Sequence, residues 1–588
     1  MNNITEENAM GRKYILFTTL IITTIILSAC GTTTTPTAVT TEAPPVTTEA
    51  PPVVTEAPTT APAAKTVLTI TWTEEFDSLS PLYTNMSFST YTQPLWNAWA
   101  WQFDDKGDPY PLLVTEIPSL DNGGIAADGT TITMTLRSDI MWSDGEPLTS
   151  ADFKFTYEMY VDEHNSVSSA YPYTLVTSLD TPDDNTVVMH FDAPFAPWLA
   201  SFWHSLIPEH ILKPVFEADG TLDNAEWNLA PTVGLGPYVF DTWESGSYAR
   251  FVKNENYWGT PAKIDEIFFR FVPDETAQVN SLLAGDADLG YWFEWIDAQK
   301  LEEAGFSIVV KPNGFNEGLF FLVNNTDSTY NGNPIGHPAM LDARVRQALA
   351  MAIDRETLNQ NLNLGFTKVP QSYWDSVPLY NDLKNTVYTY DPAGANKLLD
   401  EAGWIDSNGD GTRDKDGIEL VLGYGTTDQE KRQKAQVVIQ ENLKAVGIGT
   451  DLTSLASDLF FAGYADAGPT YTGDLDIQEW SDIQSYPDAD IYYWYCSEIP
   501  TPDYPAGTNS FYLCDEELDA LMTLQTTQLN YQERHATFQK INDIFGQKVY
   551  WLGLWQDPDN WAVSSKLQNV KFSAVNPFYN IAEWTKTP

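Results

Sequence analysis

An acidic loop in the second half of the sequence has the oxygen donors that a hard cation requires. Its candidate ligands are Asp406, Asn408, Asp410, Thr412 and Asp414. The first three stand at positions 1, 3 and 5 of a Ca²⁺ loop, and Gly411 stands at position 6, where such a loop turns. Gly417 occupies position 12, where a bidentate glutamate is expected. The favoured interpretation is therefore an Asn-Gly and Asp-Gly hairpin, and any bound calcium would be structural.

The amino terminus has the pattern of a secretion signal. Arg12 and Lys13 precede the apolar run Tyr14–Leu27, which is shorter than the roughly 20 residues of a membrane span. The segment from Leu27 to Cys30 resembles the bacterial lipobox, in which the cysteine is acylated and becomes the new amino terminus. We therefore expect residues 1–29 to be a lipoprotein signal peptide and Cys30 to carry the lipid. An ordinary cleaved signal is the alternative.

Cys496 and Cys514 are the cysteines that remain after Cys30. In an exported chain, two cysteines so close in sequence favour a disulfide, because the compartment permits one. Such a bridge would stabilise the fold by about 3 kcal/mol if it acts on chain entropy. Two free, buried thiols are the alternative.

The other reactive side chains show no catalytic pattern. The sequence has no nucleophile elbow and no zinc-binding histidine motif, and it contains 6 histidines in all. Its 81 acidic residues against 31 basic ones give a net charge of −50, which disfavours nucleic acid and anionic membranes as main partners. So many acids leave room for a paired-carboxylate hydrolase, but nothing selects a pair. We expect no enzyme activity and no required cofactor, with structural calcium as the one candidate ion.

A low-complexity segment separates the signal from the rest of the chain. Residues 30–65 consist mostly of Thr, Pro, Ala, Val and Glu, and Thr-Glu-Ala-Pro recurs at Thr41, Thr48 and Thr55. Such a composition lacks the apolar mass to form a core. We expect a disordered tether, which could reach roughly 100 Å in a polyproline conformation.

From residue 66 onward the composition is that of an aromatic-rich globular protein, long enough for two or three lobes. Alternating apolar residues predict strands at 67–72, 131–137, 186–191 and 266–272. Helical spacing predicts helices at 341–353, 391–404, 433–448 and 531–545. Mixed strands and helices indicate α/β lobes.

Several sequence blocks then follow one another in a recognisable order. They are Trp142–Phe153, Val233–Phe240, Asn254–Trp258, Leu283–Leu289, Arg344–Arg355 and Tyr390–Trp404. The first carries an Asp-Gly turn and a Thr-x-x-Asp helix start, and the second contains Gly-x-Gly-Pro-Tyr. Read in this order, the chain resembles the extracytoplasmic solute-binding proteins of family 5, the dipeptide, oligopeptide and nickel group. The resemblance extends from about residue 67 to 575.

The resemblance implies an α/β clamshell of the periplasmic-binding-protein type, class II, with an extra inserted lobe and three lobes in all. The implied division is 66–101, 232–314 and 549–588 for lobe I, 102–231 for the inserted lobe II, and 315–548 for lobe III. Several crossings of the chain between lobes would form a hinge. A ligand that contacts both sides can then stabilise the closed state.

The resemblance also implies a ligand site. Trp480 and Asp482 resemble the family stretch in which an aspartate after a tryptophan pairs with the amino terminus of a peptide through a charge-assisted hydrogen bond. Here the aspartate follows by two residues instead of the usual three, so a surface acid is the alternative. A loop that resembles a second contact segment contains Tyr83, Thr84, Asn85 and Met86, for which a structural turn is the alternative. Relatives also carry a disulfide in a place similar to that of Cys496 and Cys514.

Two further groups of residues could serve the ligand. The aromatic residues that could line the cleft are Tyr291, Trp292 and Trp295, although packing between lobes is the simpler role for them. Arg344 and Arg346 could clamp a carboxylate. Asp342 precedes Arg346 by four residues and Asp354 ends the helix, so structural ion pairs are favoured instead.

The amino-terminal pattern and the resemblance together imply a monomeric, extracytoplasmic lipoprotein on the cell membrane, and the resemblance implies that it captures a small solute and delivers it to an ABC permease and its ATPase subunits. A di- or oligopeptide is the default ligand. An oligosaccharide is the nearest alternative, because sugars stack on tryptophan and need no amine anchor. A secreted hydrolase and a tethered adhesin or sensor are the more distant alternatives.

Overall fold

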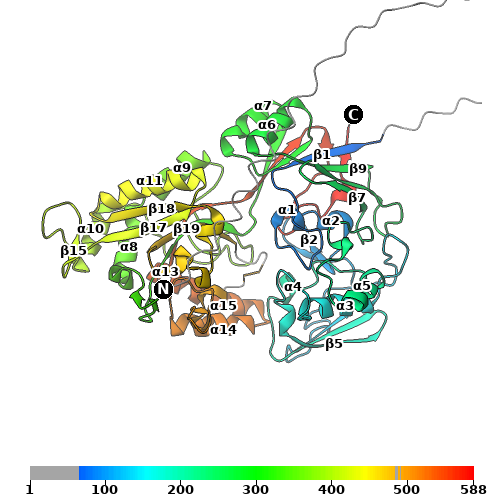
Figure 1. Ribbon diagram of the computed structural model, residues 1–588, viewed down its shortest axis with the longest axis horizontal. Helices are drawn as coiled ribbons and strands as arrows, with labels where there is room; N and C mark the ends of the chain where they lie inside the picture. Colours follow the sequence, from blue (N-terminus) through cyan, green and yellow to red (C-terminus); the bar gives the residue numbers. More distant parts are fainter. Residues whose placement is uncertain (1–64, 484–487, 490–491, 588) are drawn as a thin grey trace, which may run out of the picture. The chain divides into compact units, whose positions relative to one another are not determined.

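The computed structural model describes residues 65–483, 488–489 and 492–587. The predicted signal peptide, Cys30 and nearly all of the tether lie outside these residues. The chain from residue 64 onward groups as one unit, and its strands form three main sheets (Figure 1). Among the described residues, each helix is too short or too polar to cross a membrane.

Sheet I has seven strands in the order β11-β21-β10-β1-β9-β8-β7. Their bounds are β11 Phe306–Lys311, β21 Asp559–Ser564, β10 Leu289–Tyr291, β1 Val67–Trp72, β9 Glu266–Phe271, β8 Tyr248–Lys253 and β7 Tyr238–Glu244. The central strand β1 runs parallel to both β9 and β10, so its side chains are covered on both sides. Leu68, Ile70 and Trp72 on one face and Thr71 on the other are accordingly buried. Helices α6 (Glu275–Ala284) and α7 (Ala298–Glu303) pack against β1, β10 and β11.

Sheet II has three antiparallel strands in the order β4-β6-β5. They are β4 Thr131–Thr135, β6 Thr186–Phe191 and β5 Val176–Asp183. Helix α3 (Ser150–Val161) covers this sheet, and α5 (Glu209–Asp219) packs on α3. The predicted Thr-x-x-Asp start is a capping box, in which Thr149 accepts from the first turn and Asp152 bonds the backbone amide of Thr149.

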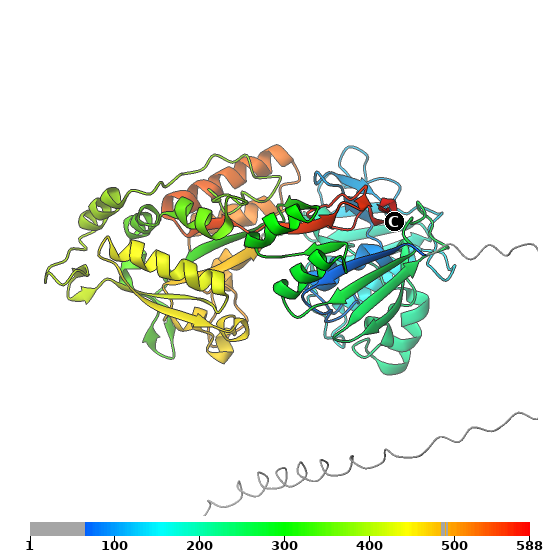
Figure 2. The ribbon, with the colours of Figure 1, turned by 90° about the horizontal axis from the view of Figure 1, so that it is seen from above.

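Sheet III has five strands in the order β18-β17-β19-β12-β20. They are β18 Gly449–Leu455, β17 Val421–Thr427, β19 Ile477–Ile483, β12 Phe315–Phe321 and β20 Trp551–Gln556. The helices of this region are α8 Ala343–Ala352, α9 Arg355–Asn363, α10 Pro392–Glu401, α11 Glu430–Lys444, α14 Glu516–Thr526 and α15 Tyr531–Lys548. The first four pack on one face and the last two on the other. Figure 2 shows this region from above, with α11 in yellow and α15 in orange. Strand β12 shows why: Leu319 and Phe321 pack toward α8 and α11, whereas Phe320 packs toward α14 and α15.

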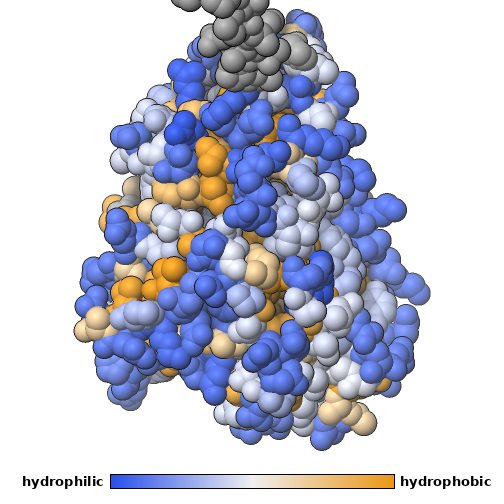
Figure 3. Space-filling view, turned by 90° about the vertical axis from the view of Figure 1, so that its right-hand side faces the viewer, coloured by the Kyte–Doolittle hydropathy of each residue, from blue (hydrophilic) through white to orange (hydrophobic). Residues whose placement is uncertain are grey.

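Short elements connect these layers. The short helices are α1 Ser87–Thr90, α2 Gln93–Trp96, α4 Trp198–Ser201, α12 Ser457–Phe460 and α13 Pro469–Thr472. The short strands are β2 Trp101–Phe103, β3 Pro109–Pro111, β13 Thr329–Tyr330, β14 Asn333–Pro334, β15 Asp414–Lys415, β16 Ile418–Glu419, β22 Leu567–Gln568 and β23 Thr585–Lys586. On the face shown in Figure 3, hydrophilic side chains predominate and apolar ones gather in small separate groups, as expected for a chain with net charge −50.

The predicted strands and helices agree with those observed, with ends that differ by a few residues. Helix α10 begins after the cap Asp391 with Pro392 at its first position, and Gly403 follows its end with φ +84°. The expected pairing of Asp342 is partly wrong. Its carboxylate binds Arg344, while Arg346 donates to the backbone carbonyls of Lys548 and Val549. Asp354 caps α9. Burial explains the difference, since Arg346 lies inside the fold.

Candidate functional site

The chain passes between sheet I and sheet III at two adjacent points. Strands β11 and β21 pair as far as Lys311 and Asp559, and pairing resumes on the other side between β12 and β20 at Asn316 and Gln556. The short connections between these pairs form a hinge. We call sheets I and II with their helices the first half, and residues 315–556 the second half. Rotation of one half against the other needs changes only in these few connecting residues.

A buried carboxylate ties the two connections to the first half. Asp559 accepts hydrogen bonds from the Tyr291 hydroxyl at 2.8 Å, the Asn313 amide at 2.9 Å and the Tyr91 hydroxyl at 3.2 Å. Burial raises the pKa of Asp559 to about 6, against the lowering effect of Tyr291, Asn313 and Tyr91. Tyr291, which was considered for the cleft, is thus part of the hinge support.

Away from the hinge, the two halves also touch. The Ala196 amide donates to the Thr526 carbonyl at 2.6 Å. Leu529 packs against the apolar core under sheet II. Such contacts between halves are what a closed arrangement requires.

Asp482 lies near the hinge end of β19, opposite Asn316 of β12. Its carboxylate is buried and accepts a hydrogen bond from Tyr493 at 2.9 Å and another from Tyr373. Two hydroxyl donors orient this carboxylate and offset part of the cost of burying it. Neither tyrosine was anticipated from the sequence: Tyr373 lies 109 residues before Asp482, and Tyr493, 11 residues after it, belongs to no recognisable motif.

Trp480 shares the face of β19 on which Asp482 lies, since the two residues are separated by one position. One side of its indole stacks on Phe320, with centroids 4.0 Å apart and planes within 8°. The exposed ring of Phe461 meets it edge-on at 6.0 Å. The arrangement presents a partly buried aromatic wall beside a fixed carboxylate, which can bind an apolar body that carries a donor.

The predicted loop at residues 83–86 lies in the first half and bonds within it. Thr84 donates to Asp77 at 2.6 Å, and Asn85 accepts from Ser168 at 3.3 Å. The hydroxyl of Tyr83 meets Asn165 at 3.5 Å. The backbone amide of Met86 bonds the Thr84 hydroxyl, and the Met86 side chain packs on the core. Among the described residues, no hydrogen bond or ring contact joins this loop to Trp480 or Asp482, so the structure brings together only the last two.

A cavity at the hinge lies on the opposite face of sheet III. It has a volume of about 600 Å³, and both halves supply its walls. Trp292 and Trp295, for which packing between lobes was the favoured role, line it, together with Glu317, Lys431 and Trp555. Side chains along β12 alternate between the two faces of sheet III, which explains why the cavity and the site at Trp480 and Asp482 lie on opposite faces. Asn316 faces Tyr373 and Ser376, whereas Glu317 faces the amino-terminal end of α11.

Glu317 forms a buried ion pair that sequence reasoning missed. Arg432 donates to both of its oxygens at 2.8 and 2.9 Å. Burial raises the pKa of Glu317 and Arg432 opposes that rise. Next to the pair, Glu479 is fully buried and bonds Tyr424, and burial followed by the Glu317 charge raises its pKa well above the usual value. Glu317 stands in the otherwise mostly apolar segment Phe315–Phe321, and no local pattern links it to Arg432.

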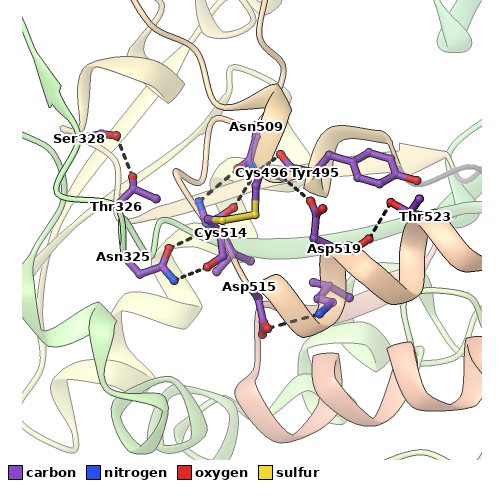
Figure 4. Close-up of a disulfide and its surroundings, with 12 residues drawn as sticks. Asn325, Thr326, Ser328, Tyr495, Cys496, Asn509, Cys514, Asp515, Asp519 and Thr523 are labelled. Atoms are coloured by element: carbon purple, nitrogen blue, oxygen red, sulfur yellow. Dashed lines mark hydrogen bonds between the residues drawn. A yellow bond between two sulfur atoms is a disulfide. The ribbon is translucent and has the colours of Figure 1, made fainter.

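The disulfide between Cys496 and Cys514 is present, with Cα atoms 4.6 Å apart. Side chains hold both ends in place (Figure 4). The Asn325 amide bonds the backbone of Cys514 in both directions, at 2.7 and 2.8 Å, and Asp519 accepts from the Cys496 amide at 2.7 Å. The bridge therefore ties Cys496 to the chain just before α14, and the alternative of free thiols is wrong.

The acidic loop at 406–414 bonds its own backbone. Asp406 accepts from the amides of Gly409 and Gly411, and Asp414 accepts from Ser407. Asn408 and Asp410 bond each other, and the Thr412 amide donates to Asp410. The loop leads into the hairpin of β15 and β16. Within the described residues, no group of acids, histidines or cysteines has metal-binding geometry.

The sequence and the fold both have known relatives. A family model for bacterial extracellular solute-binding proteins, family 5 Middle, matches residues 108–499. The oligopeptide-binding protein AppA of Bacillus subtilis is 26% identical over 511 residues, which cover 86% of this chain and 88% of AppA. The nickel-binding periplasmic protein of Escherichia coli K12 is 25% identical over 360 residues, covering 58% of this chain and 63% of that protein.

Solved structures show the same architecture. AppA of Bacillus subtilis in complex with a nonapeptide superposes with a TM-score of 0.69 at 23% identity, covering 89% of this chain and 99% of AppA. NikA of Brucella suis in complex with Fe(III)-EDTA gives a TM-score of 0.73 at 20% identity, covering 89% of this chain and 100% of NikA. The predicted α/β clamshell class is confirmed. This chain belongs to the bacterial extracellular solute-binding proteins of family 5.

Proposed function

We propose that this protein is the membrane-anchored substrate-binding component of an ABC importer and that its cargo is a di- or oligopeptide. Family membership over residues 108–499 carries the proposal. The hinge supports it, because two halves joined by two short connections can close on a solute and present a new surface to a permease. Trapping and release need no bond to be made or broken, so we propose a binding role without catalysis.

For the cargo site we propose the face of sheet III that carries Trp480 and Asp482. The Asp482 carboxylate is already held by Tyr373 and Tyr493, so a peptide ammonium would meet an oriented acceptor. Trp480 would supply apolar area next to it. For the loop at residues 83–86 we propose a contact from the other half, and we keep the lobe boundaries given above as part of the same proposal.

Calorimetry on the whole chain tests whether the cargo is a peptide. Peptides with a free amino terminus should bind, and their N-acetylated forms should bind at least about tenfold more weakly, since a charge-assisted hydrogen bond is lost. Asp482→Asn should weaken binding of the free peptides to a similar extent. Asp451→Asn is the matched control, because Asp451 is an exposed acid on the edge strand β18. Equal affinity for free and acetylated peptides would contradict the amine-binding role.

An oligosaccharide is the second candidate for the cargo, and the stacked, partly exposed Trp480 favours it. Tight binding of cello- or manno-oligosaccharides without response to any peptide would replace the peptide proposal. Turnover of a labelled peptide or glycan by the purified protein would replace the binding role itself with hydrolysis. Unchanged solute uptake after deletion of the protein would favour an adhesin or sensor.

We further propose that Cys30 carries the lipid, that residues 30–65 act as the tether, and that the protein is a monomer that partners the permease and its ATPase subunits. Cys30→Ser should release the protein from the membrane fraction. Calcium, if it binds at 406–414, would be structural. Titration with Ca²⁺ should then change the thermal midpoint and leave the affinity for cargo unaltered.

A further inference from the structure

The hinge cavity has walls from both halves of the molecule. From the first half come the amino-terminal end of α6 and residues 292–297, and from the second half come the end of α9, the start of α11 and parts of β12 and β20. In Figure 1, α6, α9 and α11 lie on the upper side of the crossing strands, and α14 and α15 on the lower side. The proposed cargo site faces the latter, so the cavity is a separate place.

Apolar side chains gather around this cavity and remain exposed. Ile296 is 70% exposed, Leu364 is 47% exposed and Trp292 is 43% exposed, and all three line the cavity. Trp292 and Leu364 both have positive φ, at 56° and 54°, which disfavours a bulky side chain. Exposed apolar groups that surround a concave site are a feature of ligand binding.

Buried aromatic rings form the inner wall. Trp295 stacks on Phe366 of the other half, with centroids 4.9 Å apart and planes within 11°. Trp555 is buried, and its indole N–H has no hydrogen-bond partner among the residues that the structure describes. The Lys431 ammonium lies 5.1 Å from the centroid of the Trp555 ring. The wall therefore already holds one cation in a cation–π contact.

The charges that remain in the cavity are mostly negative. Three lining carboxylates have cationic partners: Asp297 pairs with Lys300, Glu430 with Lys434, and Glu317 with Arg432. The other lining acids are Glu275, Glu294 and Asp557. Burial raises the pKa of Glu294, Lys431 opposes this, and Glu275 and Asp557 add to it. These acids therefore act on one another across the cavity, and the positive charges of Lys431 and Lys434 oppose them.

We propose that the hinge cavity is a second binding site, specific for an organic cation with a hydrocarbon body, such as an aliphatic diamine. The exposed apolar groups would cover the hydrocarbon. Glu294 and its neighbouring acids would bind the ammonium groups, and the tryptophan rings would contribute cation–π contact. Because both halves supply walls, occupancy of the cavity is linked to the relative rotation of the halves.

Calorimetry on the whole chain with 1,8-diaminooctane tests this site. We expect one molecule to bind, with 1,8-octanediol and octanedioate weaker by at least about tenfold, because only the diamine offers positive charge. Glu294→Gln should weaken diamine binding about fivefold. Glu302→Gln is the matched control, since Glu302 is exposed on α7 and outside the cavity. Lys431→Met should tighten binding, because it removes a like charge beside the Trp555 ring.

Three results would overturn the proposal. One is equal binding of the diamine and the diol, and another is unchanged diamine affinity in Glu294→Gln. The third is loss of diamine binding in Asp482→Asn with Glu294→Gln unaffected, which would assign the cation to the cargo site. The tightening expected for Lys431→Met keeps the test decisive, because a variant that merely disturbs the fold would weaken binding. Far-ultraviolet circular dichroism of each variant checks that it is folded.

Discussion

The buried pair of Glu317 and Arg432 offers a sharp test of how the second half is stabilised. We consider the variant Arg432→Met, which keeps most of the side-chain volume and removes the charge. Glu317 is 2% exposed and would lose both of its charge-assisted hydrogen bonds. An uncompensated buried charge costs about 3–5 kcal/mol. Because Glu317 also lines the hinge cavity, we expect a loss of about 3 kcal/mol in the free energy of unfolding.

Urea denaturation followed by tryptophan fluorescence measures this loss. The double variant Glu317→Gln, Arg432→Met should recover at least about 1 kcal/mol, because no charge is then left unpaired. Arg344→Met is the matched control. Arg344 pairs with Asp342 at 2.6 Å on the surface, so its removal should cost less than about 1 kcal/mol. The reasoning is refuted if Arg432→Met and Arg344→Met are equally stable, or if the double variant is no more stable than Arg432→Met.

Three further predictions concern the buried acid Glu479, the disulfide and the glycine at position 234. Burial raises the pKa of Glu479 in the folded state. Above about pH 4.3 the unfolded chain loses this proton, whereas the folded state keeps it. The free energy of unfolding therefore falls as the pH rises from about 4.3 toward the raised pKa. Unfolding free energies at pH 5 and pH 8 should therefore differ more in the wild type than in Glu479→Gln, and equal differences would contradict this. Replacing Cys496 and Cys514 by serine should lower stability by about 3 kcal/mol, and an unchanged urea midpoint would argue against a stabilising bridge. A Cβ at Gly234 would lie 1.9 Å from the Trp96 carbonyl oxygen, whereas one at Gly463 would meet nothing within 4 Å. Gly234→Ala should therefore lower the free energy of unfolding by more than about 2 kcal/mol, and Gly463→Ala by less than about 0.5 kcal/mol. Thermal melts of the two variants measure this difference.

Local features of the fold were predictable from the sequence because their causes are local. The alternation of Val67–Trp72 predicts β1, and Asp391 followed by proline predicts the start of α10. Thr149 and Asp152 predict a capping box. In each case the residues that determine the structure lie within a few positions of one another.

Contacts between distant segments were not predictable in this way. Arg346 was expected to pair with a neighbour on its helix, but its partners Lys548 and Val549 lie about 200 residues away. Glu317 and Arg432 are separated by 115 residues. Their meeting depends on the register of β12 in sheet III, which no local pattern determines. The family resemblance supplied the clamshell, which composition and periodicity alone would have left as unspecified α/β lobes.

The position of the candidate site was predictable only in part. Trp480 and Asp482 were identified by a motif and do share one face of β19. The tyrosines that orient Asp482 were not identified, since Tyr373 reaches it from a segment 109 residues earlier in the chain. Trp292 and Trp295 were expected to pack between lobes, with lining of the cleft as the alternative, and they line a cavity on the other face of sheet III. The strand alternation that separates the two faces becomes visible only once the register of the sheet is known.

Mass spectrometry of the solute that co-purifies from the native host tests the central claim most directly. Denaturing the protein should release one equivalent of a peptide with a free amino terminus, and prolonged incubation of that peptide with fresh protein should leave it intact. Recovery of a glycan instead of a peptide would contradict the proposed cargo. Consumption of the recovered solute by the protein would contradict the binding role itself.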